Sequence, residues 1–156
     1  MKLYLVRHGQ AKDSSEDPDP PLSDYGQKEV DHVAQKLKKH DVQVQAVYHS
    51  RKLRAKETAI TLSASLTAID GILELDGLRP MDPIEPIIQL ISEESHDIML
   101  VGHLPFMNYL ASHLTQIDEQ EAFIQFPTAC MICLEEERDR WAVTLRITPD
   151  TIWSRS

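Results

Sequence analysis

The sequence has few of the residues that mark secreted, fibrous or membrane-spanning proteins. Only two of its 156 residues are cysteine and five are glycine, which excludes a disulfide framework and a collagen-like repeat. No apolar run approaches the ~20 residues of a membrane span. The apolar stretch before Arg7 is too short for a secretory signal. We therefore expect an intracellular, cytoplasmic protein.

Basic residues are also scarce, and they are unevenly placed. The chain carries 16 Lys and Arg against 25 Asp and Glu, a net charge of −9, which argues against a nucleic-acid binder that works through a basic face. Eleven of the basic residues lie in residues 1–56, whereas residues 57–137 contain only Arg79. We expect neither a nucleic-acid nor a membrane partner, and we expect any anion site to be built from the first third of the chain.

What the sequence does contain fits one globular domain spanning residues 1–156. Its 42% hydrophobic and 26% charged residues are ordinary values for such a domain. Short apolar runs alternate with helical stripes, and the last two runs have only a turn at 135–139 between them. The expected strands are 3–6, 46–48, 69–75, 97–101, 128–134 and 141–147, and the expected helices begin at Ser23, Ser50, Asp82 and Pro105. This order predicts a three-layer α/β/α sandwich with a mainly parallel central sheet and a C-terminal antiparallel hairpin.

Arginine or histidine follows each of three strong strands. Arg7-His8-Gly9 comes after the first, Arg54 lies in SRKLRA after the second, and Gly102-His103 comes after the third. Ligands of open α/β sheets bind beyond the carboxyl ends of the strands, and a guanidinium offers a planar fork that matches phosphate oxygens. Any one of these segments is equally well explained as a solvated loop. Their coincidence predicts an anion pocket of two histidines and two arginines, with no evident metal ligands.

Three motifs resemble those of a known family. LVRHGQA, SRKLRAKET and VGHLP occur in this order, with an acidic loop leading into PLSDYG after the first. They are similar to the signatures of the histidine phosphatase (phosphoglycerate mutase-like) superfamily, and most of all to its small SixA-type branch of phosphohistidine phosphatases. The resemblance implies that His8 is a nucleophile that forms a phosphohistidine intermediate. It implies that Arg7, Arg54 and His103 bind the phosphoryl oxygens, and that water completes the hydrolysis without a cofactor.

The chain departs from this family pattern in two places. The SixA-type loop usually reads Arg-Pro-Leu-Thr, but here it is Pro20-Pro21-Leu22-Ser23, so an expected arginine is missing. Larger members carry a helical insertion and an acidic general acid after the third strand, and 156 residues leave no room for the insertion. Asp82 is the best-placed substitute for the acid, although a helix-capping role before Pro83 explains it at least as well.

The resemblance implies a phosphatase, and a phosphohistidine-carrying protein domain of a signalling system is the expected partner. An open pocket without a lid can admit a side chain carried on another domain. One alternative is a phosphatase for small phosphorylated metabolites or nucleotides. Another is a non-catalytic phosphate-binding module, against which the intact His8 and His103 argue. The missing insertion disfavours a mutase.

Two further features are interpreted as structural. Cys130 and Cys133 lie three apart in an expected strand, so their side chains point to opposite faces. Their Cα atoms would be about 10 Å apart, which is too far for a disulfide. His49 lies beside the predicted pocket but matches no motif.

Overall fold

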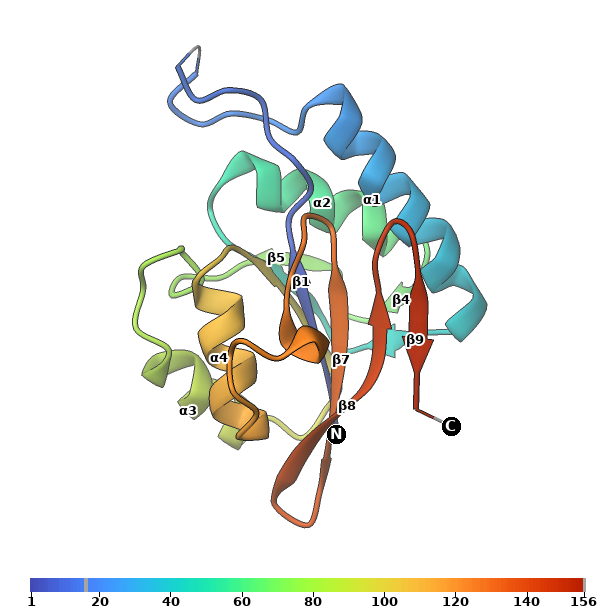
Figure 1. Ribbon diagram of the computed structural model, residues 1–156, viewed down its shortest axis with the longest axis vertical. Helices are drawn as coiled ribbons and strands as arrows, with labels where there is room; N and C mark the ends of the chain where they lie inside the picture. The colour runs from blue at the N-terminus through green and yellow to red at the C-terminus, as the bar shows by residue number, and fades with distance from the viewer. Residues whose placement is uncertain (16, 156) are drawn as a thin grey trace.

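The computed structural model describes residues 1–15 and 17–155 and is organised around a seven-stranded sheet (Figure 1). The strands lie in the order β5-β3-β6-β1-β7-β8-β9. Their bounds are β1 (Lys2–Arg7), β3 (Val47–His49), β5 (Ile72–Glu74), β6 (Ile98–Gly102), β7 (Met131–Glu137), β8 (Arg140–Ile147) and β9 (Ile152–Ser154). The first four in spatial order are parallel, and each later pair is antiparallel. A separate parallel pair joins β2 (Gln43–Val44) to β4 (Thr67–Ala68).

Helices cover both faces of the sheet, as predicted. The helices are α1 (Asp24–Leu37), α2 (Leu53–Ser63), α3 (Glu85–Glu93) and α4 (Phe106–Thr115), with short 3₁₀ turns η1 (Lys38–His40) and η2 (Ala122–Ile124). Tyr4 and Val6 of β1 belong to the core that contains the buried residues of α1 and α2. Leu3 and Leu5 belong to the opposite core, with those of α3 and α4. The alternation along β1 therefore places it between two helical layers.

Three helix caps were expected, and one is confirmed. The Ser23 side chain accepts a hydrogen bond from the Gly26 backbone N–H at 2.9 Å, at the start of α1. The prediction for Ser50 is wrong, because α2 begins at Leu53 with Lys52 in the cap position. The prediction for Asp82 is also wrong, because α3 begins at Glu85 after Ile84. In both cases the polar side chain bonds elsewhere.

The C-terminal region is antiparallel as expected, but its turn is tighter. The strand β7 continues through Glu137, and the turn consists of Arg138 and Asp139, with φ values of 52° and 62°. Positive φ at both central residues suits the right-handed twist of a two-residue hairpin. A third strand, β9, follows and was not predicted, because three residues carry too little periodicity to be recognised.

The two cysteines lie on opposite sides of the sheet, as predicted. Cys133 packs in the core with α1 and α2, and Cys130 packs in the core with α3 and α4. Both are free and buried, and burial raises the pKa of Cys130 to about 12 and that of Cys133 to about 11. Both thiols are therefore protonated packing residues at neutral pH. Across the part of the chain that is described, no helix is long and apolar enough to cross a membrane.

Candidate active site

The three histidine- and arginine-bearing segments meet at one edge of the sheet. Strand β6 lies between β1 and β3 and is parallel to both. The His8 backbone N–H donates to the Gly102 carbonyl at 3.0 Å, and the Ser50 N–H donates to the Val101 carbonyl at 3.1 Å. The residues that follow these three strands therefore emerge side by side. We call the group formed by Arg7, His8, Arg54 and His103 the strand-end site.

The hydrogen bonds of His8 show which of its two ring nitrogens is unprotonated. Its Nδ1 lies 2.5 Å from the Gly9 carbonyl oxygen. A carbonyl can only accept, so Nδ1 carries the proton and Nε2 carries the lone pair. Arg54 Nε donates to that Nε2 at 3.3 Å. Burial lowers the pKa of His8 to about 4, and the charges of Arg54 and Arg7 act in the same direction. His8 is thus a neutral imidazole near pH 7, with the lone pair of its Nε2 beside a guanidinium.

His103 lies against His8 and is held by a buried serine. The two ring centroids are 4.9 Å apart. His103 Nε2 lies 2.5 Å from the Ser50 hydroxyl, and Ser50 is fully buried. Burial, followed by the neighbouring His8 and Arg54, lowers the pKa of His103 to about 3. Its Nδ1 is buried and has no hydrogen-bond partner among the described residues, so it is an orphaned polar atom at the centre of the site.

The two arginines approach the site from different elements. Arg7 ends β1 and donates from Nη1 to the Phe126 carbonyl at 2.8 Å. Its Nε is buried without a partner in the described structure. Arg54 lies in the first turn of α2. Burial lowers the pKa of both arginines, and both stay cationic at neutral pH. The result is a group of two fixed positive charges and two neutral imidazoles, which suits a phosphoryl group.

Glycine is required where the chain leaves β1. A Cβ added to Gly9 would lie 2.7 Å from Val30 Cγ2 and 2.9 Å from the Gly26 carbonyl oxygen. Because α1 packs this closely, no side chain fits at this position, and the Gly9 N–H donates to Thr58 Oγ1 of α2 at 3.1 Å. These contacts tie the loop after His8 to both helices on that face.

Two residues near the site were missed or misinterpreted from the sequence. Ser50 was expected to cap a helix, but its hydroxyl bonds to His103 instead. Asp19 was not singled out. Its Oδ1 accepts from the Leu53 N–H at 3.1 Å, and its charge partly offsets the effect of burial on the pKa of Arg54. Asp19 directly precedes Pro20, the position at which the SixA-type loop usually has arginine. This departure from the family pattern was the signal in the sequence that could have pointed to Asp19.

Asp82 lines a cavity that is separate from the strand-end site. Its Oδ2 accepts from the Arg79 backbone N–H at 2.9 Å, which explains why it does not cap α3. It lines a cavity of about 380 Å³ together with Arg51, Asp76 and Arg79, and neither His8 nor His103 contributes to that lining. The described residues contain no group of three or more His, Cys, Asp or Glu side chains placed to hold a metal ion.

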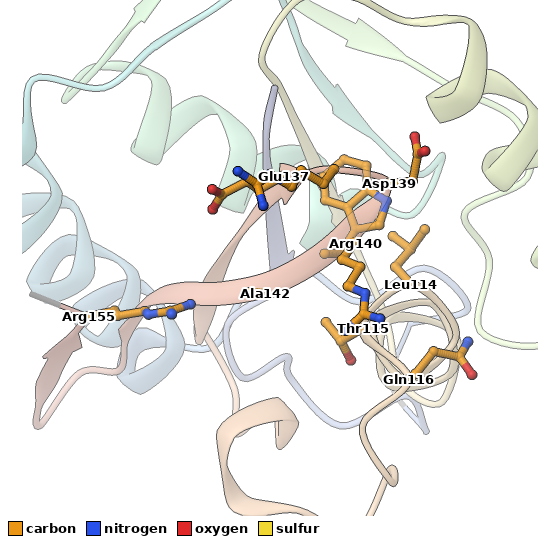
Figure 2. Close-up of a pocket in the computed structure, with 10 residues that line it drawn as sticks. Leu114, Thr115, Gln116, Glu137, Asp139, Arg140, Ala142 and Arg155 are labelled. Atoms are coloured by element: carbon orange, nitrogen blue, oxygen red, sulfur yellow. The ribbon is translucent and has the colours of Figure 1, made fainter.

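A larger cavity of about 920 Å³ lies elsewhere (Figure 2). It is formed by the end of α4, the turn between β7 and β8, and Arg155. We call it the hairpin cavity. Its lining contains no histidine, so it lacks the histidine and arginine grouping of the strand-end site.

Comparison with known proteins identifies the family of the chain. Residues 3–83 match the family model of the histidine phosphatase superfamily (branch 1), and this segment, just over half of the chain, contains Arg7, His8 and Arg54. The chain belongs to this superfamily and is a phosphatase.

Its relatives include a phosphohistidine phosphatase. The chain is 28% identical over 119 residues to phosphohistidine phosphatase SixA of Escherichia coli, with 73% of this chain and 74% of that protein covered. It is 33% identical over 113 residues to an uncharacterised protein of Picosynechococcus sp., with 67% of each covered.

Solved structures share the fold. A structure of the protein histidine phosphatase SixA complexed with tungstate superposes with a TM-score of 0.83 at 23% identity, covering 96% of this chain and 98% of that one. A phosphoserine phosphatase from Entamoeba histolytica in complex with phosphoserine superposes with a TM-score of 0.67 at 15% identity, covering 92% and 94%.

Proposed function

We propose that the protein removes phosphoryl groups through a covalent intermediate on His8, and that its substrate is phosphohistidine on a partner protein. The observation that carries this proposal is the state of His8. Its Nδ1 donates to the Gly9 carbonyl, and its unprotonated Nε2 accepts from Arg54 Nε, so the lone pair lies beside a guanidinium that could hold an anion.

The proposed reaction has two displacements at phosphorus. His8 Nε2 attacks, the bond from phosphorus to the leaving nitrogen or oxygen breaks, and the phosphoryl group is transferred to His8. A water molecule then attacks the same phosphorus, loses its proton to solvent, and releases inorganic phosphate with neutral His8. Arg7, Arg54 and His103 are proposed to donate hydrogen bonds to the phosphoryl oxygens, whose charge they stabilise in both transition states.

The leaving group favours phosphohistidine over a sugar or serine phosphate. An alkoxide is a strong base and needs an acid to protonate it, which typically contributes about 10²–10⁴-fold to the rate. An imidazole has a conjugate-acid pKa near ~6.5, so a protonated phosphoramidate nitrogen departs without much help. The candidate acid is Asp82, whose carboxylate accepts the Arg79 N–H and lines another cavity. The related E. coli protein is named as a phosphohistidine phosphatase.

The second candidate is a phosphatase of small phosphorylated metabolites. It is favoured by the fold shared with the phosphoserine phosphatase of E. histolytica. In either case we propose that residues 1–156 act as one domain in the cytoplasm.

A series of substrates ranked by leaving-group pKa separates the two candidates. We expect high rates with phosphohistidine and with aryl phosphates of acidic phenols, and poor rates with phosphoserine and sugar phosphates. Asp82→Asn should lose little on phosphohistidine and more on basic leaving groups, whereas Asp76→Asn, which changes another carboxylate in the same cavity, should alter neither. A flat dependence in the wild type would reject the phosphohistidine assignment. An equal loss on every substrate in Asp82→Asn would remove Asp82 as the acid.

A further inference from the structure

One carboxylate outside the strand-end site joins the two segments that flank the nucleophile. Glu29 lies in α1, and its Oε1 accepts from the Gln10 backbone N–H at 3.1 Å. The Thr128 hydroxyl lies 3.0 Å from Oε1 and 2.8 Å from Oε2. Gln10 follows His8 by two residues, and Thr128 lies 99 residues further along the chain than Glu29.

The segment that contains Thr128 holds Arg7 and His8 directly. The Phe126 carbonyl accepts from Arg7 Nη1 at 2.8 Å. The Ala129 N–H donates to the His8 carbonyl at 3.0 Å, and the Arg7 N–H donates to the Cys130 carbonyl at 3.0 Å. We call residues 126–130 the arginine-holding segment. It fixes one end of the Arg7 guanidinium by a single carbonyl, so the angle of the guanidinium follows the position of this segment.

Glu29 makes hydrogen bonds to this segment and not to Arg7. The ion pairs found in the described structure do not include Glu29 with Arg7. The carboxylate is nevertheless close enough to oppose the lowering of the Arg7 pKa by burial. Hydrogen bonds to a charged acceptor are stronger than neutral ones. The hydroxyl of Thr128 therefore makes a firm link between α1 and the arginine-holding segment.

We propose that Glu29 is a positioning residue for phosphoryl transfer, which holds the arginine-holding segment through Thr128 and so orients the Arg7 guanidinium at the phosphoryl group. The inference rests on the proposed function, because it requires Arg7 to be a phosphoryl ligand. The Arg7 guanidinium would then have to be aligned with the phosphoryl oxygens in the transition state. A small displacement of the guanidinium would lower kcat.

The test compares matched variants with p-nitrophenyl phosphate as the substrate. Glu29→Gln keeps the size and removes the charge, and Thr128→Val keeps the shape and removes the hydroxyl. Each should lower kcat by roughly 10-fold, as expected for a charge-assisted hydrogen bond, with KM within about 2-fold. The double variant should be no worse than either single variant, because both remove the same link. Asp31→Asn removes an exposed carboxylate of the same helix and should leave kcat unchanged.

The link to Arg7 is tested in an Arg7→Ala background. If Glu29 acts through Arg7, Glu29→Gln should change the residual kcat by less than about 2-fold there. An equal 10-fold loss in both backgrounds would overturn the proposal, and so would a lowered melting temperature with kcat unchanged. Full activity in Arg7→Ala alone would instead reject the proposed function at this residue.

A second measurement does not depend on activity. The Arg7 Nε–H resonance, assigned by its loss in Arg7→Ala, should shift in ¹⁵N–¹H spectra of Glu29→Gln and Thr128→Val and stay in place in Asp31→Asn. An unmoved resonance in the first two variants would overturn the proposal even where the rates are too low to compare.

Discussion

The strand-end site and the hairpin cavity lie at opposite ends of the sheet. Lys2, at the start of β1, pairs with Glu135, so the turn after Glu137 extends beyond that start, whereas His8 follows the end of β1 (Figure 1). The hairpin cavity has a volume of about 920 Å³ and three arginines in its lining. Those arginines are exposed, and charges in water interact weakly.

We infer from this contrast that the convergence of buried groups marks the reactive end. At the strand-end site a lone pair on His8, a guanidinium and an orphaned His103 nitrogen lie close together. Burial lowers the pKa of both histidines there, and perturbed histidines that share a site are typical of catalysis. The hairpin cavity has positive charge without a nucleophile.

The largest effect should come from the nucleophile itself. We expect His8→Ala to lower kcat by roughly 10⁴-fold or more, as loss of a covalent nucleophile does in other enzymes, while circular dichroism shows a retained fold. His113→Ala, an exposed histidine of α4, is the matched control and should keep wild-type kcat. Substantial turnover in His8→Ala would contradict the inference that the strand-end site, and not the opposite end of the sheet, is the reactive end.

Arginine geometry should have the next largest effect. Arg54→Lys keeps the charge and removes the planar fork, so we expect a loss of roughly 10²-fold in kcat/KM if its donors act on the transition state. Arg51→Lys changes an exposed arginine that pairs with Asp76 at 2.8 Å, and it should change kcat/KM by less than about 2-fold. Equal sensitivity at both positions would show that charge near the strand ends, and not the Arg54 fork, is what matters.

The buried histidines should also make the protein sensitive to acid. Their folded pKa values, about 4 for His8 and about 3 for His103, lie below the ~6.5 of an exposed imidazole. Because folding lowers these pKa values, the stability they contribute is complete above pH ~6.5 and is lost as the pH falls towards the folded values. For His8 alone the loss between pH 7.5 and pH 4 is on the order of 3 kcal/mol in the free energy of unfolding.

Urea unfolding at these two pH values checks the sign and the size. The difference in unfolding free energy should shrink by about 3 kcal/mol in His8→Ala and should not change in His113→Ala. A stability that is independent of pH in the wild type would mean that the two rings are not buried as neutral groups.

The smallest effect should come from the hairpin cavity. Arg140→Gln removes one of its exposed charges, and we expect kcat/KM to change by less than about 2-fold, because exposed charges at the far end of the sheet are screened from the site. A large loss measured with a phosphorylated protein, but not with an aryl phosphate, would show that this cavity binds the partner.

The sequence predicted the elements that carry strong local signals. The Ser23 cap and the three motif-bearing strand ends are confirmed in the structure. The apolar strand runs are confirmed as well, but β5 begins at Ile72 rather than at residue 69 and β7 begins at Met131 rather than at residue 128. It failed where a polar side chain bonds across the chain. Ser50 was expected to cap a helix, but its partner is His103, 53 residues away. The link from Glu29 to Thr128 spans 99 residues and has no local pattern at all. The two-residue strands β2 and β4 are too short for periodicity.

The most direct test of the role of His8 is to trap its intermediate. The enzyme is mixed rapidly with a ³²P-labelled phosphoryl donor, quenched in alkali to preserve the acid-labile phosphoramidate, digested, and analysed by mass spectrometry. We expect one phosphoryl group per active enzyme on the peptide that contains His8, bonded to Nε2 and absent from His8→Ala. Label on His103, or turnover without any labelled enzyme, would contradict a covalent role for His8.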